Sequence, residues 1–407
     1  MKHIKYANLY VEKYTNDFLI LDFITEKEFI FFRNNGDYLE SMRLNEYYPS
    51  MLLFYKVKNI AVSEGDILTI PMQELINHKK SSPINFYQRN RDEEFNGIFM
   101  IFDNAEWLEN LFSSKLAYKN NLLLNELVEY VDGTWDDGSP CALNNLGENI
   151  CVEIVDVSQG STNLIYDEYN LAIFDFGASI YASKTTLKNI VFTIQNRFEN
   201  FDRASLIISH WDYDHYNLLT VIDEQILKNF CCVFIPSAII SLTAKQIVNK
   251  LVSNCRYIRT FSSEATKTKN NINIKPVITK DNYTLYVGEK SKDINKSGLM
   301  LSIKGNEAVT ILGADHTNRQ ISSCIDSLVG SYENYIELNI VVPHHGGYCG
   351  KGKTKIPPFL IPGTAAISVG KNSYKHPNQF TIDRYKDNGF KVLRTDWERK
   401  NIKIEMK

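Results

Sequence analysis

One short segment constrains the fold of this 407-residue chain more than any other: the run Ser209-His-Trp-Asp-Tyr-Asp-His215, which follows the apolar triplet Leu206-Ile207-Ile208. The run places two imidazoles and two carboxylates within six residues. Such side chains repel and desolvate one another unless a cation lies among them. The segment therefore predicts a metal-binding loop at the carboxyl end of a strand, and a metal in such a loop usually serves hydrolysis.

Other apolar segments in the second part of the chain follow the same rule, because each ends in a polar residue of a catalytic type and then a turn. Examples are the segment before Asp175, residues 309–312 before Asp315, residues 338–343 before His344, and residues 365–369 before the loop with His376. Ligands and active sites gather at one end of neighbouring strands in layered α/β folds. We therefore expect an α/β fold from about residue 148 onward. A helix is expected over Lys184–Phe198, where apolar residues recur at a spacing of three to four.

Six side chains are expected to hold metal. The first two in the chain are two residues apart and point the same way if the strand continues, so they share one cation. The next two lie at the turn beyond and can reach a second cation. Asp315 comes from a distant strand and can bridge both ions, and either His344 or His345 completes the set; we favour His344 because it is nearer the strand. The predicted ligands are His210, Asp212, Asp214, His215, Asp315 and His344.

These motifs resemble those of the metallo-β-lactamase superfamily. The run from His210 to His215 is similar to the superfamily motif H-x-H-x-D-H, with Asp212 in place of the second histidine. The closer resemblance is to the hydrolase domain of ComEC-type competence proteins, and it covers residues from about 148 to 400. The segments that carry it are residues 156–161, Phe174-Asp-Phe-Gly177, Asn295-Lys-Ser297, the Gly-x-Asp that ends in Asp315, His344-His-Gly346 and His376-Pro377.

The resemblance implies an αββα sandwich and one or two divalent metal ions, most readily zinc or manganese. It further implies that Asp175 orients loop groups and the metal-bound water, and that His376 contacts a phosphate oxygen or protonates a leaving group. Asp214 can accept or orient the proton of the water. The chain lacks the separate third-motif histidine of the superfamily, and Asp212 supplies oxygen where the superfamily has nitrogen. Oxygen donors favour harder cations, so manganese, iron and magnesium are open beside zinc.

Residues 1–140 differ from the rest of the chain. They carry 14 Lys+Arg and 22 Asp+Glu, a net charge of 14 − 22 = −8. Short β-like runs, among them residues 28–32, precede a helix-like stretch over residues 107–130. We expect a small α+β domain that acts as a protein-partner or sensor module. A turn-rich linker at residues 132–140 is expected to join it to a hydrolase domain of residues 148–407.

The composition limits the functions that fit the chain. A formal net charge of −3 gives no bulk attraction to nucleic acid or anionic membrane, and no apolar run approaches the length of a membrane helix. Seven cysteines without a C-x-x-C pair favour a reducing, cytoplasmic compartment over a disulfide framework. The predicted function is a metal-dependent hydrolase of ester bonds, a phosphodiesterase or nuclease acting on a nucleic acid or nucleotide. The alternatives are a metallohydrolase of small esters or lactones, and a degenerate metallo-fold with a binding or regulatory role.

Overall fold

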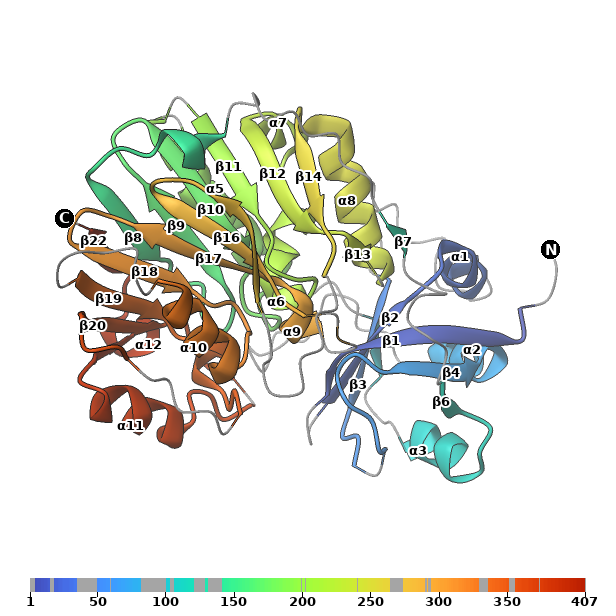
Figure 1. Cartoon of the computed structure of the whole chain (residues 1–407). Helices are drawn as coiled ribbons and strands as arrows, with labels where there is room; N and C mark the ends of the chain where they lie inside the picture. The colour runs from blue at the N-terminus through green and yellow to red at the C-terminus, as the bar shows by residue number, and fades with distance from the viewer. Residues whose placement is uncertain are drawn as a thin grey trace. The chain divides into compact units, whose positions relative to one another are not determined.

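A computed structural model describes most of the chain, which forms two compact units (Figure 1). The first unit comprises residues 1–130, 181–186 and 238–249, and the second comprises residues 131–180, 187–237 and 250–407. The expected linker at 132–140 lies outside the described residues, and the division into domains 1–140 and 148–407 stays a prediction. The structure describes residues 4–14, 18–34, 50–58, 60–81, 100–102, 106–120, 129–130, 141–198, 200–201, 203–239, 241–263, 274–289, 291, 294–328, 336–350, 356–372 and 374–406.

A six-stranded sheet forms the first unit, in the order β5-β3-β2-β1-β4-β6. Neighbouring strands are antiparallel except β3 and β5, which are parallel. The strands are β1 (Tyr6–Tyr14), β2 (Phe18–Phe23), β3 (Met51–Tyr55), β4 (Ile67–Pro71), β5 (Met100–Phe102) and β6 (Tyr118–Asn120), with a separate pair of β7 (Glu129–Tyr130) and β13 (Ala238–Ile239). The helices are α1 (Glu26–Asn34), α2 (Met72–Ser81), α3 (Glu106–Ser113) and α8 (Leu242–Asn254), which continues into the second unit.

Two local expectations for this unit are wrong. Residues 28–32, read as β-like, lie within helix α1: Thr25 precedes the helix and its hydroxyl accepts a hydrogen bond from the Glu28 amide at 3.3 Å. Phe29 and Phe32 then fall on one helical face and enter the core. The helix expected over residues 107–130 ends at Ser113, because the chain turns through a left-handed residue at Lys115 (φ 59°) and re-enters the sheet as β6.

Two seven-stranded sheets form the second unit. The first has the order β14-β12-β11-β10-β9-β8-β22 and the second the order β15-β16-β17-β18-β19-β20-β21. Strands of the first sheet are β8 (Ile150–Ile154), β9 (Thr162–Tyr166), β10 (Asn170–Phe176), β11 (Arg203–Ile207), β12 (Phe230–Pro236), β14 (Ile258–Phe261) and β22 (Ile402–Met406). Strands of the second are β15 (Lys275–Thr279), β16 (Tyr283–Val287), β17 (Leu299–Lys304), β18 (Ala308–Leu312), β19 (Ile336–Val341), β20 (Leu360–Ile367) and β21 (Lys391–Arg394).

Helices cover the outer faces of these sheets. The longer ones are α5 (Lys184–Phe198), whose bounds match the expected helix, α10 (Asn318–Ser327) and α11 (Gln379–Asp387). Short helices and 3-10 turns occur at η1 (Ala142–Asn145), α6 (Tyr213–Tyr216), η2 (Asn217–Thr220), α7 (Glu224–Leu227), α9 (Ile294–Ser297), η3 (Pro343–Gly346) and α12 (Thr395–Glu398). None of the described helices is long and apolar enough to cross a membrane.

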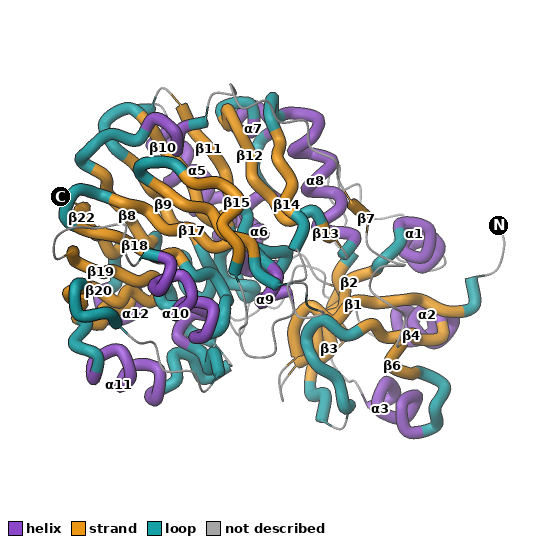
Figure 2. Tube along the Cα trace, in the orientation of Figure 1, coloured by secondary structure: helices purple, strands orange, loops and turns teal. Residues whose placement is uncertain are grey.

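The packing gives the second unit four layers, helix–sheet–sheet–helix. One buried core lies between the sheets and combines residues of both, such as Phe174 and Leu301. A second core joins the outer face of the second sheet to α10 and α11, through residues such as Ile321 and Ile382. On the outer face of the first sheet, Phe198 of α5 packs edge-on against Phe230 of β12 at 5.4 Å between ring centroids. This arrangement, visible in Figures 1 and 2, confirms the expected αββα class.

Parallel strands bring the candidate site together. In the first sheet β10, β11 and β12 run parallel to one another, and in the second sheet β18, β19, β20 and β21 do so as well. The segments that follow the carboxyl ends of such strands share one edge of each sheet. Asp175, near the end of β10, and the predicted ligands after β11, β18 and β19 all occupy this position.

Candidate metal centre

The loop after β11 holds His210 rigidly. Its preceding residue, Ser209, accepts a hydrogen bond at its carbonyl from the Leu299 amide at 2.7 Å, and the Ser209 hydroxyl lies 2.9 Å from Nδ1 of His210. Gly298 permits this contact with the second sheet, because a Cβ at position 298 would lie only 2.6 Å from the Ser209 carbonyl oxygen. With Nδ1 occupied, the imidazole presents Nε2 to the interior of the site. Ser209 was missed by sequence reasoning, although it separates the apolar strand from the first histidine.

Helix α6, which follows directly, carries Asp214 and His215. Its amino end is held to the segment before β9 because the Ser161 amide donates to the Asp214 carbonyl at 3.0 Å. Gly177 makes this approach sterically feasible, because a Cβ there would lie 2.0 Å from the same carbonyl oxygen. The side chains of Asp214 and His215 are almost fully buried. The short helix therefore fixes both side chains on the inner edge of the first sheet.

Asp175 connects these two anchoring segments. One carboxylate oxygen, Oδ2, lies 2.7 Å from Nδ1 of His215, and the other, Oδ1, accepts a hydrogen bond from the Ser209 amide at 2.7 Å. The residue has a left-handed backbone (φ 61°) at a bulge in β10, which turns its carboxylate toward the loop after β11. Asp175 is fully buried. It does not itself belong to either group of metal-type ligands, and its two contacts hold the ring of His215 and the backbone of Ser209.

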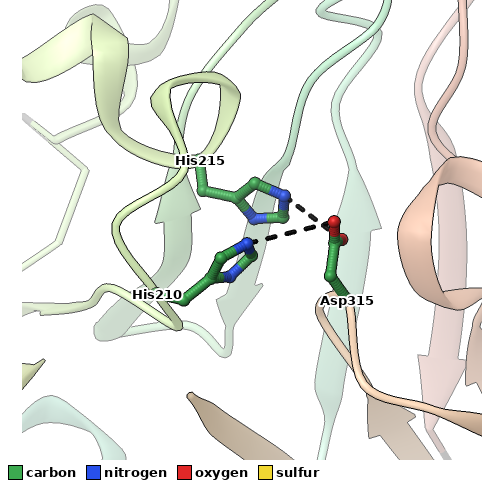
Figure 3. A group of neighbouring side chains, drawn as sticks. All are labelled: His210, His215 and Asp315. Atoms are coloured by element: carbon green, nitrogen blue, oxygen red, sulfur yellow. Dashed lines mark ion pairs between the residues drawn. The ribbon is translucent and has the colours of Figure 1, made fainter. Parts of the chain in front are cut away.

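Asp315 reaches the site from the turn after β18, and Figure 3 shows the imidazoles of His210 and His215 directed at its carboxylate. Oδ1 lies 3.2 Å from Nε2 of His215, and Oδ2 lies 3.9 Å from Nε2 of His210. On its other side, Oδ2 lies 2.7 Å from Nδ1 of His344. Asp315, His210 and His215 form one of two described groups whose ligand atoms all lie within 4.8 Å of one another.

The second such group is Asp214, His215 and His345. Nε2 of His345 lies 3.4 Å from Oδ2 of Asp214, while its Nδ1 lies 3.0 Å from the Ser368 carbonyl. Sequence reasoning favoured His344 over His345 as the ligand. The structure brings the buried His345 into the group, whereas His344 keeps 24% of its side chain exposed and lies against Asp315.

The two remaining predicted residues lie at the margins. Oδ2 of Asp212 is 3.5 Å from Nε2 of His210, so Asp212 borders the first group. The centroid of the His376 ring lies 5.1 Å from that of the His344 ring. His376 therefore contacts His344, which in turn contacts Asp315. The loop of His376 is held by Asn372, whose side chain bonds both the amide and the carbonyl of His376.

His316, which follows Asp315 directly, belongs to neither ligand group. Its Nδ1 lies 2.9 Å from the Gly313 carbonyl, and the ring is buried. Burial lowers the pKa of His316 to about 4, so the ring is neutral. His316 therefore does not replace the third-motif histidine that the chain lacks.

The charge balance of the site suits a cation. Burial opposes the charged form of His215, but the carboxylates of Asp315 and Asp175 raise the pKa of His215 well above its ordinary value. Burial also opposes ionisation of Asp315, yet the imidazoles of His344 and His215 hold the pKa of Asp315 well below its usual range. The site therefore demands positive charge next to the Asp315 carboxylate, which a proton on an imidazole or a metal ion can supply.

Five buried atoms test whether a metal fits. Nε2 of His210, His215 and His345 and both carboxylate oxygens of Asp315 have no partner in hydrogen-bond geometry. Buried polar atoms are normally satisfied, so a convergent set without such partners needs an explanation. All three imidazoles are held at Nδ1 and turn Nε2 inward, as metal-bound histidines do. The residues present therefore fit one or two divalent cations.

Comparisons with known proteins give structural neighbours only. The sequence matches no protein-family model and no curated protein. Solved structures that resemble it include Tm1679, described as a metal-dependent hydrolase of the β-lactamase superfamily, with 14% identity over 63% of this chain and 98% of that one (TM-score 0.35). Another is the metallo-β-lactamase fold protein YhfI from Bacillus subtilis, with 11% identity over 63% and 99% (TM-score 0.35). A diphosphatase of the PhnP family has 8% identity over 63% and 98% (TM-score 0.33).

Proposed function

We propose that this chain is a metal-dependent hydrolase of phosphodiester bonds in a nucleic acid or nucleotide. The observation that carries the metal dependence is the set of five buried, inward-facing nitrogen and oxygen atoms of His210, His215, His345 and Asp315. The preference for a phosphodiester comes from the resemblance of the sequence motifs to the ComEC-type branch. A site that holds cations near a hydrolysable bond suits an anionic substrate, whose charge they neutralise.

The proposed ligands divide into two sets that share Asp315. His215 belongs to both described ligand groups, but its Nε2 can bind only one ion, and we assign it to the second. His210, Asp212 and Asp315 would then hold one cation, and Asp214, His215, His345 and Asp315 the other. The first set has a single imidazole and two carboxylates, which favours manganese, whereas the second has two imidazoles and suits zinc. His344 would act outside the second set, by orienting Asp315 at 2.7 Å.

The bound cations would supply Lewis acidity and lower the pKa of water toward neutrality. The chain's own residues do the remaining work. Asp214 is placed to accept a proton or to orient the attacking water, since its carboxylate lies on the inner edge next to His345. Asp175 keeps His215 in one tautomer and one orientation. His376, whose ring lies 5.1 Å from that of His344, belongs to neither ligand group and can contact a phosphate oxygen or protonate the leaving group.

The structure weakens the ester or lactone alternative. That alternative needs an apolar pocket near the ligands, and Trp211 and Tyr213 are the aromatic residues that lie between the ligands in the sequence. Both rings are buried, with 4% and 2% exposure, and each packs edge-on against Tyr216. Neither ring therefore offers an apolar wall to a substrate.

Metal content and a substrate panel test the proposal together. The full chain is purified without chelator, its metals are measured by mass spectrometry, and bis-p-nitrophenyl phosphate, oligonucleotides, thioesters and lactones are offered with zinc or manganese. We expect at least one metal per chain and turnover of phosphodiesters. A metal-free protein without activity would instead support the degenerate, regulatory alternative, and turnover of lactones alone would support the ester alternative.

The first unit has no proposed catalytic part. Its predicted role as a protein-partner or sensor module rests on the net charge of −8 over residues 1–140 and on the absence of a catalytic motif in that sequence. The chain is proposed to work in the cytoplasm, because its cysteines follow no disulfide framework.

A further inference from the structure

Three cysteine thiols gather around Ser205, the middle residue of β11. The Cys232 sulfur lies 3.0 Å from the Ser205 hydroxyl oxygen and 2.8 Å from the sulfur of Cys141, and its single proton can be donated to either. Cys141 and Cys231 each have their sulfur within 3.6 Å of the same hydroxyl. Ser205 belongs to β11, whose carboxyl end leads into the metal-binding loop, so this cluster is separate from that site.

A β-bulge explains how adjacent residues can both contribute thiols. Along β11 and β12, Ala204 pairs with Phe230 and Ser205 pairs with Cys232, which leaves Cys231 as an extra residue on β12. Successive side chains of a regular strand point to opposite faces, and a bulge breaks that alternation. Cys231 therefore turns to the side of Ser205 as well, and it remains partly exposed while Cys141 and Cys232 are completely buried.

The geometry favours a pair of sulfurs over a metal site. Neither of the two groups of three or more metal-type ligands in the described residues contains a cysteine. Cys141 and Cys232, by contrast, have their sulfur atoms in direct contact although they are 91 residues apart in the chain. Two thiols in contact, with a third thiol beside them that solvent can reach, form an arrangement suited to thiol–disulfide exchange.

We propose that Cys141 and Cys232 form a reversible disulfide, and that Cys231 is the thiol through which a hydroperoxide oxidises them. Cys231 attacks the terminal oxygen of the hydroperoxide ROOH; the O–O bond breaks, ROH leaves with a proton from solvent, and Cys231 becomes a sulfenic acid. Cys232 attacks the Cys231 sulfur and water leaves. Cys141 then attacks the Cys232 sulfur and releases the Cys231 thiolate. In sum, two thiols and ROOH give one disulfide, ROH and water.

The charge states of the three thiols agree with this order. The hydrogen bond with Cys232 lowers the pKa of Cys141, the thiol that attacks last. The hydrogen bond with Cys232 lowers the pKa of Cys231 to about 6, so Cys231 is largely a thiolate at neutral pH. Burial raises the pKa of Cys232 well above its ordinary value, so this thiol stays protonated until it meets an activated sulfur. Cys255 provides a contrast: burial raises its pKa to about 12, and its sulfur contacts only the Leu227 carbonyl among its described hydrogen-bond partners.

Peptide mapping tests the proposal on the full chain. The reduced protein is treated with hydrogen peroxide, its remaining thiols are alkylated, and it is cut with trypsin and a glutamate-specific protease. Cleavage after Glu129 and Glu148 gives peptide 130–148 with Cys141 as its single cysteine, and cleavage after Lys228 and Lys245 gives peptide 229–245. We expect these two peptides to be joined by a disulfide, and the oxidised protein to melt roughly 5–10 °C higher because a loop of 91 residues is closed.

Four serine variants assign the roles. Cys141→Ser and Cys232→Ser should abolish the joined peptides, Cys231→Ser should keep them but slow their formation at least about 10-fold, and Cys255→Ser should behave like the parent protein. The proposal is overturned if peroxide leaves every thiol of the parent open to alkylation, or if Cys232→Ser still joins the two peptides. A Cys231→Ser variant that oxidises at the parent rate would overturn the part assigned to Cys231. Metal content serves as the folding control for all four variants, since these positions lie outside the metal centre.

Discussion

His344 and His345 are neighbours in the chain, yet their imidazoles contact different carboxylates. Nδ1 of His344 lies 2.7 Å from Oδ2 of Asp315, whereas Nε2 of His345 lies 3.4 Å from Oδ2 of Asp214. The cause is local: both residues have left-handed backbones, with φ of 53° and 52°, so the chain turns sharply between them and the side chains diverge. One histidine enters the buried site and the other stays at its mouth.

The first prediction follows from this difference. His345→Ala removes a proposed ligand and should weaken metal binding by more than about 100-fold, while His344→Ala removes a residue that contacts Asp315 but is not a proposed ligand, and should weaken it about 10-fold to 100-fold. Titration of the metal-free protein with zinc or manganese, followed by calorimetry, measures both. If His344→Ala were the more damaging of the two, the earlier assignment of His344 as the ligand would be correct instead.

Asp175 gives a second prediction. Asp175→Asn replaces the carboxylate that lies 2.7 Å from Nδ1 of His215 with an amide, whose weaker acceptor no longer favours one tautomer of the ring. Asparagine tolerates the left-handed backbone of this position, so the fold should persist. We expect metal affinity to fall about 10-fold to 100-fold, measured by competition with a chromogenic chelator.

Asp156→Asn is the matched control for that experiment. Asp156 also follows a strand of the first sheet, but it is exposed and accepts a hydrogen bond only from the Ser158 amide among its described contacts. Metal affinity should stay within about twofold of the parent. Equal losses in both variants would show that the effect at Asp175 is not transmitted through His215.

The positions of the candidate ligands along the chain could be predicted from the sequence because strand ends carry a strong signal. An apolar run that stops at Ile208 and continues as His210 to His215 limits where those side chains can go. The helix over Lys184–Phe198 could be predicted in the same way, because the spacing of its apolar residues indicates which face is buried. The layered fold follows from these repeated units.

Details that depend on single backbone angles could not be predicted. The choice between His344 and His345 depends on two consecutive left-handed residues that are not glycine. The position of Cys231 beside Ser205 depends on a bulge in β12, and no spacing in the sequence indicates a contact between Cys141 and Cys232, which are 91 positions apart. In the first unit, Thr25 decided between strand and helix for residues 28–32, because it supplies the hydrogen-bond acceptors for the first turn of α1.

Asp22 gives a prediction of pH dependence. It is fully buried in the first unit, where its carboxylate accepts hydrogen bonds from the Ser50 hydroxyl at 2.5 Å and the Thr243 amide at 3.0 Å. Burial outweighs these bonds and raises the pKa of Asp22 from 3.8 to about 6. Between these two values the folded form retains a proton that the unfolded form has lost. The contribution of Asp22 to stability therefore falls by about 3 kcal/mol as the pH rises from about 4 to 6, and this contribution stays constant above.

Asp22→Asn tests this contribution. The amide keeps an acceptor for Thr243 and has no proton to lose, so the difference in unfolding free energy between variant and parent should grow in favour of the variant from pH 4 to pH 6. Urea unfolding at several pH values, followed with a probe in the first unit, measures it. Parallel curves for the two proteins would mean that the pKa of Asp22 is not raised in the folded protein.

The outer face of the first sheet in the second unit contains a buried carboxylate, Glu153, with 2% exposure. Arg197 of α5 donates to it through two nitrogens, at 2.9 and 3.0 Å, and Tyr166 and Asn401 donate at 2.9 and 2.6 Å. Burial opposes ionisation, but these donors lower the pKa of Glu153. The stability that Glu153 contributes is therefore present above its unfolded pKa and is lost as the pH falls through its folded pKa.

Arg197→Met should cost about 2–3 kcal/mol, because it leaves a buried carboxylate with two neutral donors and no balancing bidentate cation. Lys403→Met is the matched control: Lys403 also faces Glu153, but at 3.7 Å and with 55% of its side chain exposed, so its removal should cost less than about 1 kcal/mol. Chemical unfolding at pH 7 compares the two.

The cost of Arg197→Met should shrink as the pH approaches 4, because Glu153, without its arginine partner, takes up a proton in the folded variant. A cost that is independent of pH would assign the effect of Arg197 to the packing of its side chain over Tyr166, where the guanidinium lies 5.1 Å from the ring centroid, and not to its charge.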